Sequence, residues 1–194
     1  MINAIIEGYL PNTSDSYERL QKEKEYINYI NNHKLKVREI YLNKFVPLLD
    51  KSLTLETISE DEFKQGIRDA ESNINTHDDS KFGEEEFDQY RMRYYPTVEE
   101  KKWLEANYGE NLDKFVEEAV DHHYKINPHH PKYWVEENGN IRDMSINYII
   151  EMLCDWISSG DDTRVWYQNS ASKEKSWMST RTKQIVEELL DILQ

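Results

Sequence analysis

Residues 26–48 read Y-I-N-Y-I-N-N-H-K-L-K-V-R-E-I-Y-L-N-K-F-V-P-L. Large apolar or aromatic side chains recur in this stretch every three or four residues, which is the spacing of one face of an α-helix. Thr13, Ser14 and Asp15 offer N-terminal caps, so we expect a long helix from about residue 13 to about Leu49. The inward stripe that the spacing predicts is Tyr26, Ile30, His33, Val37, Tyr41, Lys44 and Leu48.

Helical periods continue through the rest of the chain, and no strand-like alternation of any length interrupts them. Two capping boxes, Ser59 with Glu62 and Thr97 with Glu100, mark further helix starts. The expected inward stripes are Phe63, Ile67, Ala70, Ile74 and His77; Leu112, Phe115, Ala119, His122 and Ile126; Ile146, Ile149, Ile150, Leu153 and Ile157; and Ile185, Leu189 and Ile192. The sequence therefore predicts an all-α fold.

The length of 194 residues is enough for one hydrophobic core. We expect a single-domain helical bundle over residues 1–194, with a functional core at 13–160 and a C-terminal connector and helix at 161–194. The segment N-P-H-H-P-K-Y-W at 127–134 is expected to be a loop, because its two prolines end the preceding helix and restrict the backbone.

The chain is strongly acidic, with 38 acidic against 24 basic side chains and a net charge of −14. This balance argues against a protein that holds long nucleic acid, because such binding depends on neutralising phosphates. One cysteine, Cys154, excludes an intrachain disulfide and a thiolate zinc cluster. No apolar run approaches the ~20 residues of a membrane span, and the N-terminus lacks the features of a signal peptide, so we expect a cytoplasmic protein without membrane contact.

All six histidines lie at four places along the chain, three on the inward face or at the end of expected helices and one in the proline-bracketed loop. They are His33, His77, the pair His122 and His123, and the pair His129 and His130. Together with Asp78 and Asp155 they form a nitrogen and oxygen ligand set typical of a divalent transition metal such as manganese, iron, cobalt, nickel or zinc. We expect one or two ions, held by His33, His77, Asp78, His122, His129 and Asp155.

Structural interpretations of the same residues stay open. The inward faces do not separate His122 from His123, and the loop does not separate His129 from His130. Asp78 also fits the cap of the next helix, and Asp155 fits a salt bridge to an arginine. The loop itself is compatible with a tight corner that Trp134 anchors in the core.

Several side chains near the expected ligands are candidates for binding an anionic substrate. Lys81 lies three residues after Asp78 and is placed to offset phosphate charge. The other candidates for substrate contact are Lys125, His130 and the ring of Trp134, which offers a stacking surface for a base.

The order of these ligands resembles that of the HD-domain metal-dependent phosphohydrolases. His33, then the pair His77 and Asp78, and then Asp155 stand at the matching places. The segment H-D-D-S-K at 77–81 is similar to an H-D-x-G-K variant of that motif, with Ser80 where glycine is usual. The resemblance implies an HD-like helical core with one or two metals that hydrolyses phosphate mono- or diesters, often of nucleotides. Extra histidines in multinuclear members lie in the interval that 122–130 occupies here.

Most of the chain, about residues 26–193, also resembles an uncharacterised family common in phages and bacteria. The matching segments are H-D-D-S-K-F at 77–82, E-E-F-D-Q-Y at 85–90, H-H-Y-K-I-N-P-H-H-P-K-Y-W at 122–134, E-M-L-C-D-W at 151–156 and W-Y at 166–167. This family adds no function of its own.

The leading hypothesis is a metal-dependent phosphohydrolase that acts on a nucleotide or a similar small phosphoester. In it a metal-bound hydroxide attacks phosphorus, Asp78 or a neighbouring acid orients it, and Lys81 offsets developing charge. The alternative is a non-catalytic phage accessory protein that uses the same fold to bind or sequester a nucleotide or a host protein. Its acidic surface is complementary to a basic partner.

Overall fold

The computed structural model describes residues 13–160, 163–169 and 172–193. These residues form helices joined by turns, and their only β-type pairing is an isolated bridge between Val135 and Ile141. The predicted all-α fold is confirmed. No helix within the described ranges is both long and apolar enough to cross a membrane.

The chain divides into two compact units, each built from two separate segments. The first unit comprises Met1–Ile30 and Lys81–Asp121, and the second comprises Asn31–Ser80 and His122–Gln194. The divisions fall within the helix Thr13–Ile40, within the 3-10 turn Asp79–Phe82 and within the helix Leu112–Ile126.

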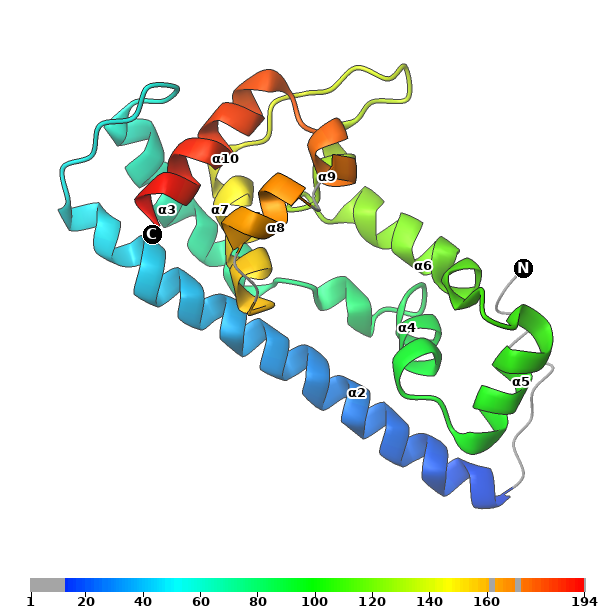
Figure 1. The fold of residues 1–194 in the computed structure, drawn as a ribbon. Coiled ribbons are helices and arrows are strands. Elements are labelled where there is room, and N and C mark those ends of the chain that lie inside the picture. The colour runs from blue at the N-terminus through cyan, green and yellow to red at the C-terminus, as the bar shows by residue number, and fades with distance from the viewer. Residues whose placement is uncertain (1–12, 161–162, 170–171, 194) are drawn as a thin grey trace. The chain divides into compact units, whose positions relative to one another are not determined.

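The first long helix, α2 (Thr13–Ile40), continues into a π-helical turn (Tyr41–Phe45) and a 3-10 turn (Val46–Asp50), which matches the expected helical run (Figure 1). The expected inward position of Lys44 is wrong: Lys44 is exposed, and Phe45 is buried instead. The π-helical turn accounts for the difference, because its wider repeat adds a residue and shifts the inward face by one position.

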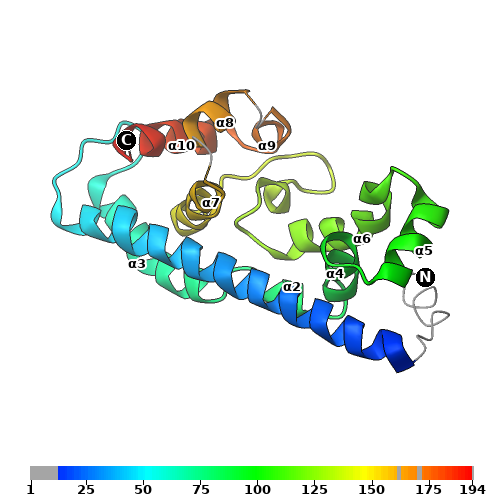
Figure 2. The same cartoon turned by 60° about the horizontal axis from the view of Figure 1, so that its bottom comes forward.

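The core of the second unit is centred on α3 (Glu60–Asn75) and α7 (Ile146–Ser158), which lie side by side (Figures 1 and 2). Ser59 caps α3 as expected, since its hydroxyl accepts a hydrogen bond from the Glu62 N–H. Gly66 allows the close approach of the two helices: a Cβ at this position would lie 2.4 Å from Cγ2 of Ile146. The packing of α3 on α7 sets where the residues at the end of α3 meet those of α7.

The C-terminal helices share this core. They are α8 (Thr163–Asn169), α9 (Ser172–Ser176) and α10 (Thr180–Ile192), and α10 packs against α7. The buried apolar side chains of α10 include Ile185 and Leu189, as its stripe predicts. The helices α8, α9 and α10 are therefore part of the second unit.

The first unit contains α4 (Phe87–Tyr94), α5 (Val98–Tyr108) and most of α6 (Leu112–Ile126). The predicted capping box of Thr97 and Glu100 is confirmed, with both reciprocal hydrogen bonds formed. Glu100 also makes a buried two-pronged ion pair with Arg91, at 2.6 and 2.8 Å. This pair ties α4 to α5 inside the first unit.

Candidate metal centre

Four separate parts of the second unit bring ionisable side chains together. His33 comes from α2, His77 and Asp78 from the turn after α3, and Asp155 from α7. Residues His123, His129 and His130 come from the end of α6 and the following loop. Asp78 has a positive φ of 59°, a backbone conformation that aspartate tolerates better than most residues. That conformation turns the chain sharply, so that the side chains of His77 and Asp78 both point into the cluster of ionisable residues.

The first group joins His33, His77, Asp78 and Asp155. The two Nε2 atoms of His33 and His77 are 3.2 Å apart. Both lie 3.6 Å from Oδ2 of Asp78, and they lie 3.1 and 3.8 Å, respectively, from Oδ1 of Asp155. The four residues that the HD resemblance implied as ligands are thus adjacent in space.

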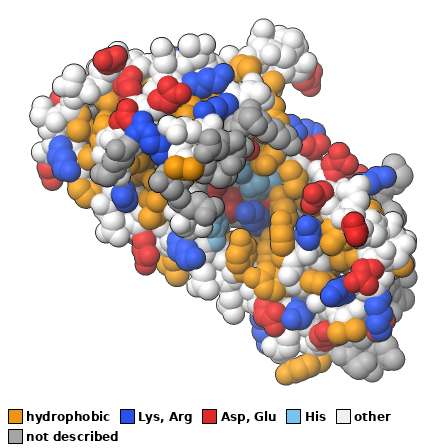
Figure 3. Space-filling view, viewed as in Figure 1, with side chains coloured by type: hydrophobic (Ala, Val, Ile, Leu, Met, Phe, Trp, Pro, Cys, Tyr) orange, Lys and Arg blue, Asp and Glu red, His pale blue; other side chains and the backbone are white. Residues whose placement is uncertain are grey.

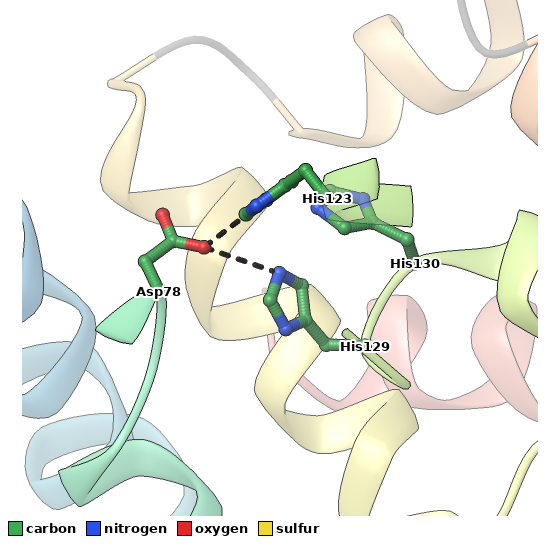
Figure 4. A group of neighbouring side chains, drawn as sticks. All are labelled: Asp78, His123, His129 and His130. Atoms are coloured by element: carbon green, nitrogen blue, oxygen red, sulfur yellow. Dashed lines mark ion pairs between the residues drawn. The ribbon is translucent and has the colours of Figure 1, made fainter. Parts of the chain in front are cut away.

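The second group forms on the other oxygen of the same aspartate (Figure 4). Oδ1 of Asp78 lies 3.3 Å from Nε2 of His123 and 3.6 Å from Nε2 of His129. His130 completes the group, with its ring centroid 4.2 Å from that of His129 and 4.8 Å from that of His123. Asp78 therefore presents one carboxylate oxygen to each group of histidines, the arrangement of a carboxylate that bridges two ions.

The spacing of these atoms fits a metal site. Two ligand atoms ~2.1 Å from one ion and ~90–110° apart are ~3.0–3.4 Å from each other. The measured separations of 3.1–3.8 Å in the first group match or slightly exceed that spacing. Nε2 of His129 and Nε2 of His130 are buried and have no hydrogen-bond partner among the described residues. A cation bound by these nitrogens satisfies them both.

The opposite ring nitrogens of the histidines are held by hydrogen-bond partners. Oε1 of Glu151 accepts from Nδ1 of His77 at 2.9 Å and from Nδ1 of His129 at 3.1 Å. The Ser158 hydroxyl donates to the Asp155 carbonyl, which leaves its oxygen to accept from Nδ1 of His33 at 3.3 Å. A ring that donates from Nδ1 keeps a lone pair on Nε2, the atom that faces the carboxylates.

Behind His123, Oγ of Ser80 and Nδ2 of Asn127 lie 3.1 and 3.0 Å from its Nδ1. The Asn127 amide also donates to Ser80, at 2.9 Å. These contacts fix the ring of His123 on the side away from Asp78. Every histidine whose Nε2 faces a carboxylate is therefore oriented from behind by a polar neighbour.

The electrostatics of the cluster favour positive charge among its carboxylates. Burial alone lowers the pKa of His77, but the charge of Asp78 and the hydrogen bond to Glu151 outweigh it and raise that pKa. Burial likewise raises the pKa of Asp155, but the hydrogen bond with His33 and the charge of His77 outweigh it and lower that pKa. Both shifts favour a positive charge at the position where a metal ion would sit.

His130 behaves differently from His77. Burial and the neighbouring charges of His129 and His123 lower its pKa well below its usual value. The ring is therefore neutral at physiological pH. A neutral imidazole is the form that binds a metal ion.

The two groups differ in their access to solvent. The side chains of His33 and Asp155 are 18% and 20% exposed, whereas those of His77 and Asp78 are 0% and 3% exposed. Histidine side chains are visible at the molecular surface in Figure 3. Solvent therefore reaches the first group at His33 and Asp155.

The structure corrects one expected ligand. His123, and not His122, joins the group around Asp78, and His122 belongs to neither of the two groups. The buried positions of α6 step by four residues from Phe115 to Ala119 to His123, and the expected last member of the stripe, Ile126, is 45% exposed. A helix has 3.6 residues per turn, so a step of three and a step of four are both allowed, and only packing decides between them.

The expected substrate-binding residues have mixed outcomes. Trp134 is buried in the core of the second unit, and its Nε1 donates to the Pro128 carbonyl at 2.7 Å, so it anchors the loop and offers no open stacking surface. His130, expected to contact substrate, lies within the second group of ligands. Lys125 is exposed on α6. Lys81 belongs to the first unit, where its ammonium lies 5.9 Å from the Tyr90 ring centroid, and its role stays a prediction.

Glu151 is the member of the cluster that sequence reasoning missed. It lies one helical turn before Asp155 on α7, and these two residues carry the only charges of that apolar helix. Two carboxylates spaced i and i+4 on an otherwise apolar helix share one face. This spacing is the sequence signal by which Glu151 could have been found.

Comparison with known proteins identifies the family. The chain belongs to the family of unknown function DUF5662, whose model matches residues 22–192. No curated protein and no solved structure matches the chain.

Proposed function

We propose that this member of the DUF5662 family is a metal-dependent phosphohydrolase of the HD type that acts on a nucleotide or a similar small phosphoester. The observation that carries the proposal is the position of Asp78. Its two carboxylate oxygens face two separate groups of histidine Nε2 atoms. A dinuclear site of this kind is a common solution for in-line phosphoryl displacement.

The donor set indicates which residues would hold the ions. The first site consists of His33, His77, Asp78 and Asp155. The second consists of Asp78, His123, His129 and His130. Mixed imidazole and carboxylate donors favour manganese, iron, cobalt, nickel or zinc. Bound ions supply Lewis acidity toward phosphoryl oxygens and lower the pKa of water.

The residues of the chain have distinct tasks in this proposal. Asp78 fixes the distance between the two groups of ligands, because it is the residue that both share. Asp155, the more exposed carboxylate of the first group, is placed to orient the attacking water. These roles predict hydrolysis at the first group, where the side chains of His33 and Asp155 are partly exposed to solvent.

Hydrolysis by the manganese-loaded chain tests the proposal, with p-nitrophenol read by its absorbance, inorganic phosphate by colorimetry and nucleotide products by chromatography. The substrates are p-nitrophenyl phosphate, bis(p-nitrophenyl) phosphate and a panel of nucleoside mono-, di- and triphosphates and cyclic nucleotides. We expect turnover of at least one, reduced to background in Asp78→Ala.

Asp79→Ala is the matched control, because Asp79 is the next residue, is half-exposed and pairs with Lys34 outside the cluster. We expect it to keep wild-type turnover. If the wild-type chain binds metal and returns every substrate unchanged, the protein is a binding protein and the catalytic proposal is wrong. If Asp78→Ala hydrolyses as fast as wild type, the assigned site is wrong.

A further inference from the structure

One carboxylate oxygen contacts both halves of the cluster from behind. Oε1 of Glu151 lies 2.9 Å from Nδ1 of His77 and 3.1 Å from Nδ1 of His129. The Nε2 atom of His77 faces the first group, and the Nε2 atom of His129 faces the second. The rings of these two histidines are adjacent, with centroids 4.5 Å apart.

We infer that Glu151 is a positioning residue that couples the two metal sites by fixing the tautomer and the orientation of one histidine in each. The inference rests on the proposed metal centre and deepens it, since it makes the two sites depend on a single residue outside the ligand set. Ser158 behind His33 supports one site, and Ser80 behind His123 supports the other.

The distances favour a positioning role over direct metal binding by Glu151. Separations of 2.9 and 3.1 Å between Nδ1 and Oε1 are those of N–H···O hydrogen bonds, with a proton between the two atoms. Each imidazole then has Nε2 as its one lone pair for an ion.

The burial of Glu151 explains why its replacement is expected to lower the metal affinity of both sites. It is 4% exposed on an apolar helix, so water does not replace it as an acceptor. Without an acceptor, each ring is free to move its proton from Nδ1 to Nε2, which blocks the ligand atom. Loss of an outer partner of this kind typically reduces metal affinity ~10- to 100-fold.

The test compares Glu151→Met, which keeps the length but removes the acceptor, with Glu151→Gln, which keeps an acceptor oxygen without the charge. The metal-free full-length chain is titrated with Co²⁺ at pH 8, with affinity and stoichiometry read from its visible absorption. We expect Glu151→Met to weaken both sites ~10- to 100-fold. We expect Glu151→Gln to recover most of that loss.

The single-site controls are Ser158→Ala and Ser80→Ala. Each is expected to weaken one of the two sites and leave the other at its wild-type affinity. If Glu151→Met weakens one site alone, or if both Glu151 variants lose one whole ion from the stoichiometry, Glu151 is not a shared positioning residue. The second of these outcomes makes it a metal ligand.

A second measurement decides the inference without metal or activity. Imidazole ¹⁵N spectra of the metal-free chain at pH 8 report the tautomer of each histidine. We expect His77 and His129 as Nδ1–H tautomers in wild type and mixed tautomers in Glu151→Met, and an unchanged tautomer pattern overturns the inference. A wild-type chain that takes up no Co²⁺ contradicts the proposed function, while the tautomers still decide the role of Glu151.

Discussion

Gly66 controls how closely α3 approaches α7, and replacing it with alanine tests whether that approach builds the metal centre. The new Cβ would lie 2.4 Å from Cγ2 and 2.7 Å from Cβ of Ile146. Carbon atoms in contact are ~3.5–4.0 Å apart, so the helices must separate by about 1 Å or more. His77 follows α3, and Glu151 and Asp155 lie on α7, so this separation lengthens the contacts between them.

The expected magnitude combines two opposing terms. Overpacking in a core typically costs ~1–3 kcal/mol, and a clash this short belongs near the upper end. Alanine in place of glycine within a helix recovers up to ~1 kcal/mol. We therefore expect Gly66→Ala to lower the free energy of unfolding by ~2 kcal/mol, and to weaken metal binding as well.

Urea unfolding followed by circular dichroism measures this loss. With an m value of ~2 kcal/mol/M, the midpoint should fall by ~1 M. Ser72→Ala, an exposed substitution in the same helix, is the control and should change stability by less than ~0.5 kcal/mol. A Gly66→Ala chain as stable as wild type, with unchanged metal affinity, refutes the close packing of α3 on α7.

The remaining predictions concern neighbouring histidines and the first unit. His123→Ala should lose the second ion, while His122→Ala should bind metal like wild type. Equilibrium dialysis measures both, and the opposite result would make His122 the ligand on α6. Glu100→Gln should lower the free energy of unfolding at pH 7 by up to ~3–5 kcal/mol, since it removes the two-pronged carboxylate partner of the buried Arg91 and leaves it the longer pair with Asp88, at 3.5 Å. Burial raises the pKa of Glu100, but the hydrogen bonds from Arg91 and Thr97 outweigh it and keep that pKa below 4.5. The unfolded chain therefore binds the extra proton first, so the pair's stabilisation is present above pH ~4.5 and is lost as the pH falls through the folded pKa. Urea midpoints from pH 7 to pH 3 should fall less in Glu100→Gln than in wild type, and parallel curves would contradict this role.

The helical fold was predictable because its signals are local. Apolar spacing located α3, α7 and α10, and the Thr97 and Glu100 capping box formed as the sequence indicates. The shift from Lys44 to Phe45 was not predictable, because a π-helical turn leaves no pattern in a single sequence. The division into two units also depends on contacts between distant segments.

The candidate site was predictable in part. His33, His77, Asp78 and Asp155 converge as their order along the chain indicates. The choice of His123 over His122 depends on how α6 rotates as it packs, which a stripe of 3-4 steps leaves open. Trp134 offered an aromatic ring suited to stacking, but burial of its ring and the hydrogen bond to Pro128 made it a core residue.

Elemental analysis measures directly whether the histidines and Asp78 form a metal centre. The purified chain is dialysed against manganese beside the double variant His77→Ala, Asp78→Ala, with circular dichroism to establish that both are folded. We expect two ions per wild-type chain and none in the variant, because Asp78 serves both sites. A folded wild-type chain that retains no ion, or a variant that retains as many as wild type, would show that these residues do not form the site.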